Sequence, residues 1–195
     1  MITNQMFRKL GEKFDIEPDL LKSVALVECG TDLNGFLING NPKILFEGHI
    51  FYKEYRKIAP QAAGKCLTKN PTICYEKWTT EYYLGGMDEW ERYREAAAIN
   101  EHCAMLATSW GFPQIMGFNH KICGCNTVED FVDKMKESEE SQMDLWYHFL
   151  YNSRLIPLLK AHNWEEFTRK YNGPGQVDRY SQKLINTYNN LKGKV

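Results

Sequence analysis

PDLLKSVALVECG, residues 18–30, is the stretch of this sequence that decides how the rest of the chain is interpreted. It opens with proline and closes with glycine, which is typical of the first and the terminating positions of a helix. Within it, Leu21, Val24 and Ala25 repeat at intervals of three and four residues and predict an apolar face. Glu28 continues this spacing, so we expect its carboxyl group to project from the apolar face.

The predicted position of Glu28 favours a carboxyl group that holds its proton. Burial removes hydration from a carboxylate, and the carbonyl end of a helix places partial negative charge beside it, so both effects raise a carboxyl pKa. A carboxylic acid that stays protonated near neutral pH is suited to general-acid catalysis. The alternative is a Glu28 that turns outward or pairs with a basic side chain, since ionisable groups are seldom buried.

The composition predicts one soluble globular domain over residues 1–195. Lys and Arg number 24 and Asp and Glu 25, and this balance argues against a chain that mainly grips nucleic acid or an anionic membrane. No apolar run approaches the roughly 18 residues of a membrane span. The N-terminus lacks a basic start followed by an apolar stretch, so we expect no secretory signal and no stable membrane insertion.

The pattern along the chain predicts an α+β fold that is predominantly helical, with one small β-hairpin. The strands of the hairpin are expected at 36–38 and 44–46, around an Asn-Gly turn. Residues 60–80 hold most of the remaining turn signals and are expected to form the longest loop. The helices are expected at about 3–14, 18–28, 49–58, 88–108, 127–136, 139–152, 163–171 and 177–191.

Six cysteines and five histidines show no established ligand spacing. A bridge between Cys66 and Cys74, or a metal held by Cys123 and Cys125, are alternatives to free thiols. The absence of a secretory signal favours free thiols. We therefore expect no metal and no cofactor.

Three short segments together resemble the signatures of the lysozyme-like superfamily, which includes goose-type lysozymes and lytic transglycosylases. They are VECG at 27–30, SWGFPQIMG at 109–117 and KYNG at 170–173. With PKILFEGH at 42–49, the set resembles the N-acetylmuramidase domain of bacteriophage endolysins, over about residues 10–190. The resemblance implies a lysozyme-like fold with its small β-hairpin beside an active-site cleft.

The resemblance implies a peptidoglycan hydrolase that cleaves the β-1,4 bond between N-acetylmuramic acid and N-acetylglucosamine. Such cleavage needs a proton on the leaving oxygen, and Glu28 is the expected general acid. Glu47 is the candidate second carboxylate, a base that activates water, with a structural pairing to His49, Arg56 or a backbone amide as the alternative. Asp32 is a weaker third candidate.

The remaining candidate site residues are expected to bind substrate. Gln114 and Ile115 belong to the loop motif, and the amide of Gln114 can hold an N-acetyl group or bond to its own backbone. Trp110 stacks on a sugar ring or belongs to the core. By resemblance, Tyr171 lies near the catalytic acid, and Asn172 points its amide into the cleft.

Two departures from the family pattern occur in the matched segments. Cys29 stands where the family usually has serine, and Phe112-Pro113 replaces a commoner small or aliphatic pair. We expect neither to touch the chemistry, although Pro113 can alter the loop that positions Gln114. The peptidoglycan-binding module often joined to this domain in phage enzymes is not expected here.

Other functions remain open from the sequence. A lytic transglycosylase needs only the glutamic acid and forms 1,6-anhydro-muramic acid products, and a glycan-binding or virion structural module needs no catalysis. The phage resemblance implies a monomer that binds peptidoglycan glycan strands. It also implies synthesis in the host bacterial cytoplasm and release to the periplasmic cell wall by a holin-type route.

Overall fold

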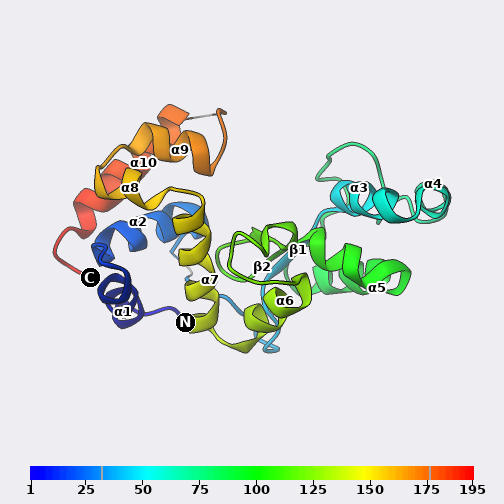
Figure 1. The fold of residues 1–195 in the computed structure, drawn as a ribbon, viewed down its shortest axis with the longest axis horizontal. Coiled ribbons are helices and arrows are strands. Elements are labelled where there is room, and N and C mark those ends of the chain that lie inside the picture. Colours follow the sequence, from blue (N-terminus) through cyan, green and yellow to red (C-terminus); the bar gives the residue numbers. More distant parts are fainter. Residues whose placement is uncertain (32, 176) are drawn as a thin grey trace.

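The computed structural model describes residues 1–31, 33–175 and 177–195. Two groups of helices lie at opposite ends of the molecule, with a small sheet and α6 between them (Figure 1). One group contains α1 (Asn4–Phe14), α2 (Pro18–Cys29), α8 (Ile156–Lys160), α9 (Trp164–Tyr171) and α10 (Val177–Leu191). The other contains α3 (Gly48–Ile58), α4 (Pro60–Lys69) and α5 (Glu89–Leu106). Between them lie β1 (Ile44–Phe46), β2 (Thr108–Trp110), β3 (Ile115–Met116), α6 (Val128–Glu137) and α7 (Glu139–Asn152), with 3-10 turns at Gly86–Asp88 and Gly117–Asn119.

Two predicted helix starts are fixed by side-chain caps. Thr127 accepts a hydrogen bond from the backbone N–H of Asp130 at 3.1 Å and begins α6. Asn163 accepts from the backbone N–H of Glu166 at 3.4 Å and begins α9. Each cap satisfies a donor that the first turn of a helix leaves without a partner.

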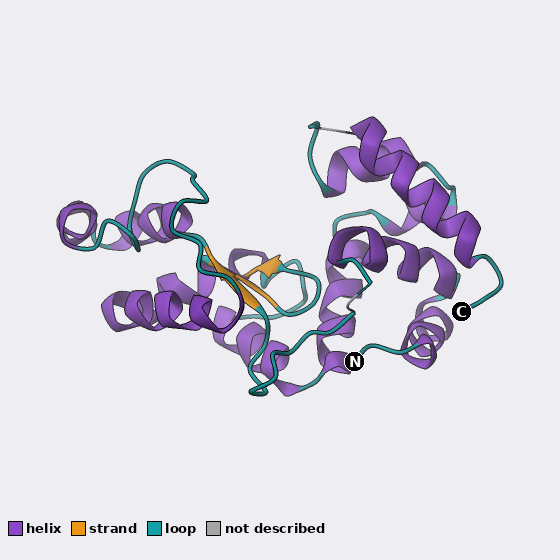
Figure 2. Ribbon diagram, turned by 180° about the vertical axis from the view of Figure 1, so that it is seen from behind, coloured by secondary structure: helices purple, strands orange, loops and turns teal. Residues whose placement is uncertain are grey.

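The predicted hairpin is wrong in its pairing. Its turn forms, but residues 36–38 contribute only an isolated bridge between Phe36 and Pro42. Strand β1 pairs instead with β2, with Ile44 opposite Trp110, and β2 continues into β3 as an antiparallel hairpin. Figure 2 shows these strands crossing the middle of the molecule. The predominantly helical α+β architecture with a small antiparallel sheet is confirmed.

The expected long loop at 60–80 is also wrong in its first half. Residues 60–69 form α4, in which Pro60 takes the first helical position, where its missing N–H costs nothing. The helix expected to reach residue 108 ends at Leu106, because Thr108 begins β2. The remaining connection, residues 70–85, contains no helix or strand in this described part of the chain.

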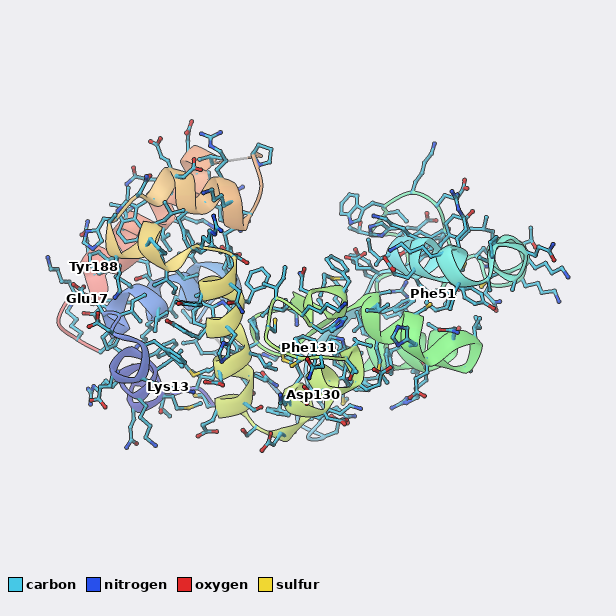
Figure 3. The ribbon with its side chains drawn as sticks, in the orientation of Figure 1. Lys13, Glu17, Phe51, Asp130, Phe131 and Tyr188 are labelled. Carbon is cyan, nitrogen blue, oxygen red and sulfur yellow. The ribbon has the colours of Figure 1, made fainter. Side chains whose placement is uncertain are left out.

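The core is continuous and holds each element in place. Phe51 of α3 and Phe131 of α6, labelled in Figure 3, are both fully buried. In the group at the chain termini, α10 packs against α2 and α9. There Tyr188 donates a hydrogen bond to the Glu17 carboxylate at 2.8 Å, just before α2 begins. This packing fixes α2, the helix that carries Glu28 in its last turn.

The six cysteines, all in described ranges, are free thiols, and five of them are buried. In the same ranges, no group of side chains has the makeup of a metal site. No described helix has both the length and the apolar character needed to cross a membrane.

Candidate active site

A cleft of about 520 Å³ lies where α2 and α9 end beside the β2–β3 hairpin. This volume lies within the range typical of ligand sites. Glu28, Gln114, Ile115, Tyr171 and Asn172, five of the predicted site residues, line it together. The other described lining residues are Cys29, Asn34, Lys43, Gly111, Phe112, Pro113, Met116, Asn119 and Phe149.

Among the described lining residues of this cleft, Glu28 carries the one carboxyl side chain. Asn172 Nδ2 donates to both of its oxygens, each at 3.0 Å. Loss of hydration among the surrounding protein atoms raises the pKa of Glu28, and it outweighs the lowering by the Asn172 hydrogen bond and by the charge of Lys183. The residue is nevertheless open to solvent. The carboxyl group therefore holds its proton to higher pH than an ordinary glutamic acid, while substrate can still reach it.

Tyr171 forms an aromatic wall of the cleft beside Glu28. Its hydroxyl accepts a hydrogen bond from Trp146 Nε1 at 3.2 Å, and its ring stacks on Phe167 with centroids 5.3 Å apart. Burial, and then the charge of Glu28, raise the pKa of Tyr171, so its hydroxyl stays protonated. This uncharged wall displaces water from one side of the Glu28 carboxyl group and so contributes to the loss of hydration that raises its pKa.

The loop from Gly111 to Gln114 forms the opposite side of the cleft. Gln114 adopts a positive φ of 50°, which is uncommon for a residue with a side chain. Its Oε1 accepts from Ser109 Oγ at 2.8 Å, and its Nε2 donates to the Gly111 carbonyl at 2.7 Å. An amide has further donor and acceptor capacity, so Gln114 can still contact a ligand from this fixed position.

Two side-chain hydrogen bonds, one of them fully buried, hold this loop against the helices. Gln142 of α7 is fully buried, and its Oε1 accepts from the Phe112 N–H at 3.0 Å. The thiol of Cys29 donates to the Phe112 carbonyl at 2.8 Å. Burial raises the pKa of Cys29 to about 12, so the group remains a thiol at neutral pH. Cys29 therefore links the end of α2 to the loop that carries Gln114.

The prediction that Trp110 stacks on a sugar is wrong. Its side chain is fully buried, with its ring edge-to-face against Trp90 and Tyr93. Its Nε1 donates to the Met105 carbonyl at 3.2 Å. A core role, the alternative for this residue, is confirmed.

Glu47 lies outside the described lining of the Glu28 cleft. It directly precedes α3, and Tyr83 Oη lies 2.8 Å and 2.7 Å from its two carboxylate oxygens. His49 Nδ1 lies 3.3 Å from Oε2, so the structural pairing with His49, which was the alternative to a catalytic base, is present. Asp32, the third candidate carboxylate, lies outside the described residues.

Several polar lining residues could not be singled out from the sequence. Lys43 belongs to the matched segment 42–49 and Asn119 follows the matched loop, so their segments carried a signal although their side chains did not. Asn34 and Phe149 had no signal, because only the fold brings them to the cleft.

Comparison with known proteins gives the family of the chain. A family model for N-acetylmuramidases, named Muramidase, matches residues 17–192. The chain belongs to the N-acetylmuramidase family. The chain is also similar to the crystal structure of the Burkholderia AP3 phage endolysin, with a TM-score of 0.86 and 30% sequence identity. That match covers 98% of this chain and 71% of the endolysin chain.

No curated protein sequence matches this muramidase-family chain. Its family and its structural likeness to a phage endolysin support peptidoglycan hydrolase activity. They also support the predicted lysozyme-like fold.

Proposed function

We propose that this chain hydrolyses the β-1,4 bond between N-acetylmuramic acid and N-acetylglucosamine, with Glu28 as the general acid. The observation that carries the proposal is the Glu28 carboxyl group in the cleft, with its pKa raised by burial. At neutral pH a larger share of such a group is protonated than of an ordinary glutamic acid. It can therefore donate a proton to the bridging oxygen as the glycosidic bond breaks.

The other cleft residues have distinct roles in this proposal. Asn172 orients the Glu28 carboxyl group through its two hydrogen bonds. Gln114 and Ile115 border the sugar on the hairpin side, and Tyr171 supplies the aromatic wall. The cleft thus combines apolar surface with a few polar groups that can orient a sugar, as small-molecule sites commonly do.

Glu47 is the proposed base that activates water. Strand β1 separates it from the cleft-lining Lys43 by four residues, or roughly 13 Å between Cα atoms at strand spacing. Glu47 thus follows directly on the strand that leads away from the cleft lining, and this continuity supports its assignment as the base. A base that activates water on the opposite face of the sugar corresponds to the inverting arrangement.

The position of Glu47 also supports a second candidate, a lytic transglycosylase. Because Glu47 is absent from the described lining of the cleft, Glu28 acts alone in this alternative. The muramic acid's own hydroxyl then attacks in place of water and leaves a 1,6-anhydro product. The two candidates share the same cleft and the same acid.

Mass spectrometry of purified peptidoglycan digested by the protein tests both candidates. Hydrolysis predicts muropeptides with reducing N-acetylmuramic acid ends, which borohydride converts to the alcohol. Transglycosylation predicts anhydro ends, which borohydride leaves unchanged. Reducing ends on N-acetylglucosamine would contradict both.

We also propose that the protein acts as a monomer and reaches the cell wall through membrane lesions made by another protein.

A further inference from the structure

Glu47 occupies a position where a carboxylate normally caps a helix. It is the residue before α3, yet its side chain makes no capping hydrogen bond. An acidic residue at this position usually accepts from the first free N–H groups of the helix. The carboxylate of Glu47 faces Tyr83 instead, so helix capping does not account for it.

Tyr83 reaches Glu47 from the connection between α4 and α5, residues 70–85. Its hydroxyl lies within hydrogen-bond distance of both carboxylate oxygens, at 2.8 Å and 2.7 Å. One hydroxyl hydrogen serves one oxygen at a time, so either oxygen can accept it, and Oε2 also has His49 Nδ1 within 3.3 Å. The side chain of Glu47 is 14% exposed, so its orientation is set by such neighbours more than by water.

A buried ion pair holds the 70–85 connection in place. Glu89 and Arg92 of α5 are 3.0 Å apart and both buried. Glu89 Oε1 accepts from the backbone N–H of Leu84 at 2.7 Å, next to Tyr83. Arg92 donates to the Thr72 carbonyl at 3.1 Å, near the start of the same connection. The position of the Tyr83 hydroxyl is thus fixed from the core.

We propose that Tyr83 is a positioning residue that orients the Glu47 carboxylate for water activation. The inference rests on the function proposed above. A hydroxyl that donates to a carboxylate favours its charged form, which is the form a base needs. Burial, and then Glu47 itself, raise the pKa of Tyr83, so the hydroxyl retains its proton for donation.

The test compares Tyr83→Phe with Tyr82→Phe, a matched control from the same connection. The Tyr82 ring packs on Tyr75, with centroids 5.1 Å apart, and so lies in the same aromatic environment. Release of reducing ends from purified peptidoglycan is measured across pH for both variants. The charged and titratable groups around Glu47 are His49 of α3, Tyr75 and Tyr83 of the connection, and Arg92 of α5.

We expect Tyr83→Phe to lower the rate by about 10–100-fold, the loss expected for a hydrogen bond to a charged group. The acidic limb of its pH–rate profile should move to higher pH, because the Glu47 carboxylate has lost the hydrogen bond from Tyr83. Tyr82→Phe should match the wild type in rate and profile. The double variant Glu47→Gln/Tyr83→Phe should be no slower than Glu47→Gln alone, since Tyr83 acts through Glu47.

The other outcomes distinguish a failure of the Tyr83 inference from a failure of the Glu47 base assignment. An inactive Glu47→Gln together with a Tyr83→Phe that behaves like Tyr82→Phe overturns the inference and leaves the base assignment standing. A fully active Glu47→Gln overturns the base assignment itself. A Tyr83→Phe protein that fails to fold, or a double variant slower than Glu47→Gln, shows that the hydroxyl serves the fold and overturns the inference.

Discussion

Replacement of Asn172 by alanine should extend activity to higher pH. Glu28 acts as an acid only while it is protonated, so activity falls as the pH rises through its pKa. The two 3.0 Å hydrogen bonds from Asn172 favour the ionised form. These hydrogen bonds partly offset the rise in pKa that burial causes, so their removal raises the pKa of Glu28 further.

The magnitude follows from the strength of the hydrogen bonds and from their exposure. A hydrogen bond to a charged group contributes about 1.5–3 kcal/mol, and one pKa unit corresponds to about 1.4 kcal/mol. Both Asn172 and Glu28 are open to solvent, so screening reduces the effect by roughly half. We therefore expect the basic limb to move up by about 0.5–1 pH unit. Asn172→Asp should move it further, because it adds a like charge.

The assay is the initial rate of reducing-end release from purified peptidoglycan as a function of pH. Asn119→Ala is the matched control, since Asn119 lines the same cleft and makes no described bond to Glu28. Carbon-13 NMR of the Glu28 side chain measures the same pKa directly. A basic limb that stays in place or moves to lower pH in Asn172→Ala would refute the reasoning.

Three further changes test the support of the cleft. Gln142→Leu should lower the free energy of unfolding, measured in urea melts, by about 1–3 kcal/mol, because it leaves the Phe112 N–H buried without its partner. An unchanged free energy of unfolding would show that the Phe112 N–H finds another acceptor. Glu89→Gln should cost about 3–5 kcal/mol, or ~6–20 °C in melting temperature, because Arg92 stays buried without its counter-charge; an unchanged melting curve would contradict this. Cys29 should be alkylated by iodoacetamide at mildly basic pH about 10³-fold more slowly than a free cysteine, given its pKa of about 12; rapid labelling of Cys29 in peptide maps would disprove the burial argument.

Much of the helical framework could be predicted because its signals are local. The caps at Thr127 and Asn163 lie within one turn of the donors that they satisfy. The apolar face of α2 follows from the spacing of its own residues, and Leu21, Val24 and Ala25 are buried as predicted. The same spacing overstated the burial of Glu28, which is exposed at the end of the helix where the cleft opens. Pro60 led to a wrong prediction, because a proline marks a helix start as well as a turn.

The sheet could not be predicted in the same way because its pairing is not local. Strand β1 meets β2 across more than sixty positions, with Ile44 opposite Trp110. Strands of two or three residues are too short for alternation to show. The burial of Trp110 follows from this pairing, which turns the ring toward Trp90. The cleft residue Asn34 was missed for a similar reason, since only the fold brings it there.

The most direct test of the central claim is the activity of Glu28→Gln on purified peptidoglycan, measured on protein whose melting temperature is compared with the wild type. The pKa of Glu28 is higher in the folded protein than in the unfolded chain. The protonated carboxyl group therefore stabilises the fold at low pH, and this stabilisation is lost as the pH rises through the pKa of the folded state. The neutral glutamine should therefore not lower the melting temperature at neutral pH. The account predicts a fully folded protein whose rate falls by about 10²–10⁴-fold, the contribution of a general acid. A folded Glu28→Gln that releases peptidoglycan fragments at the wild-type rate would contradict it.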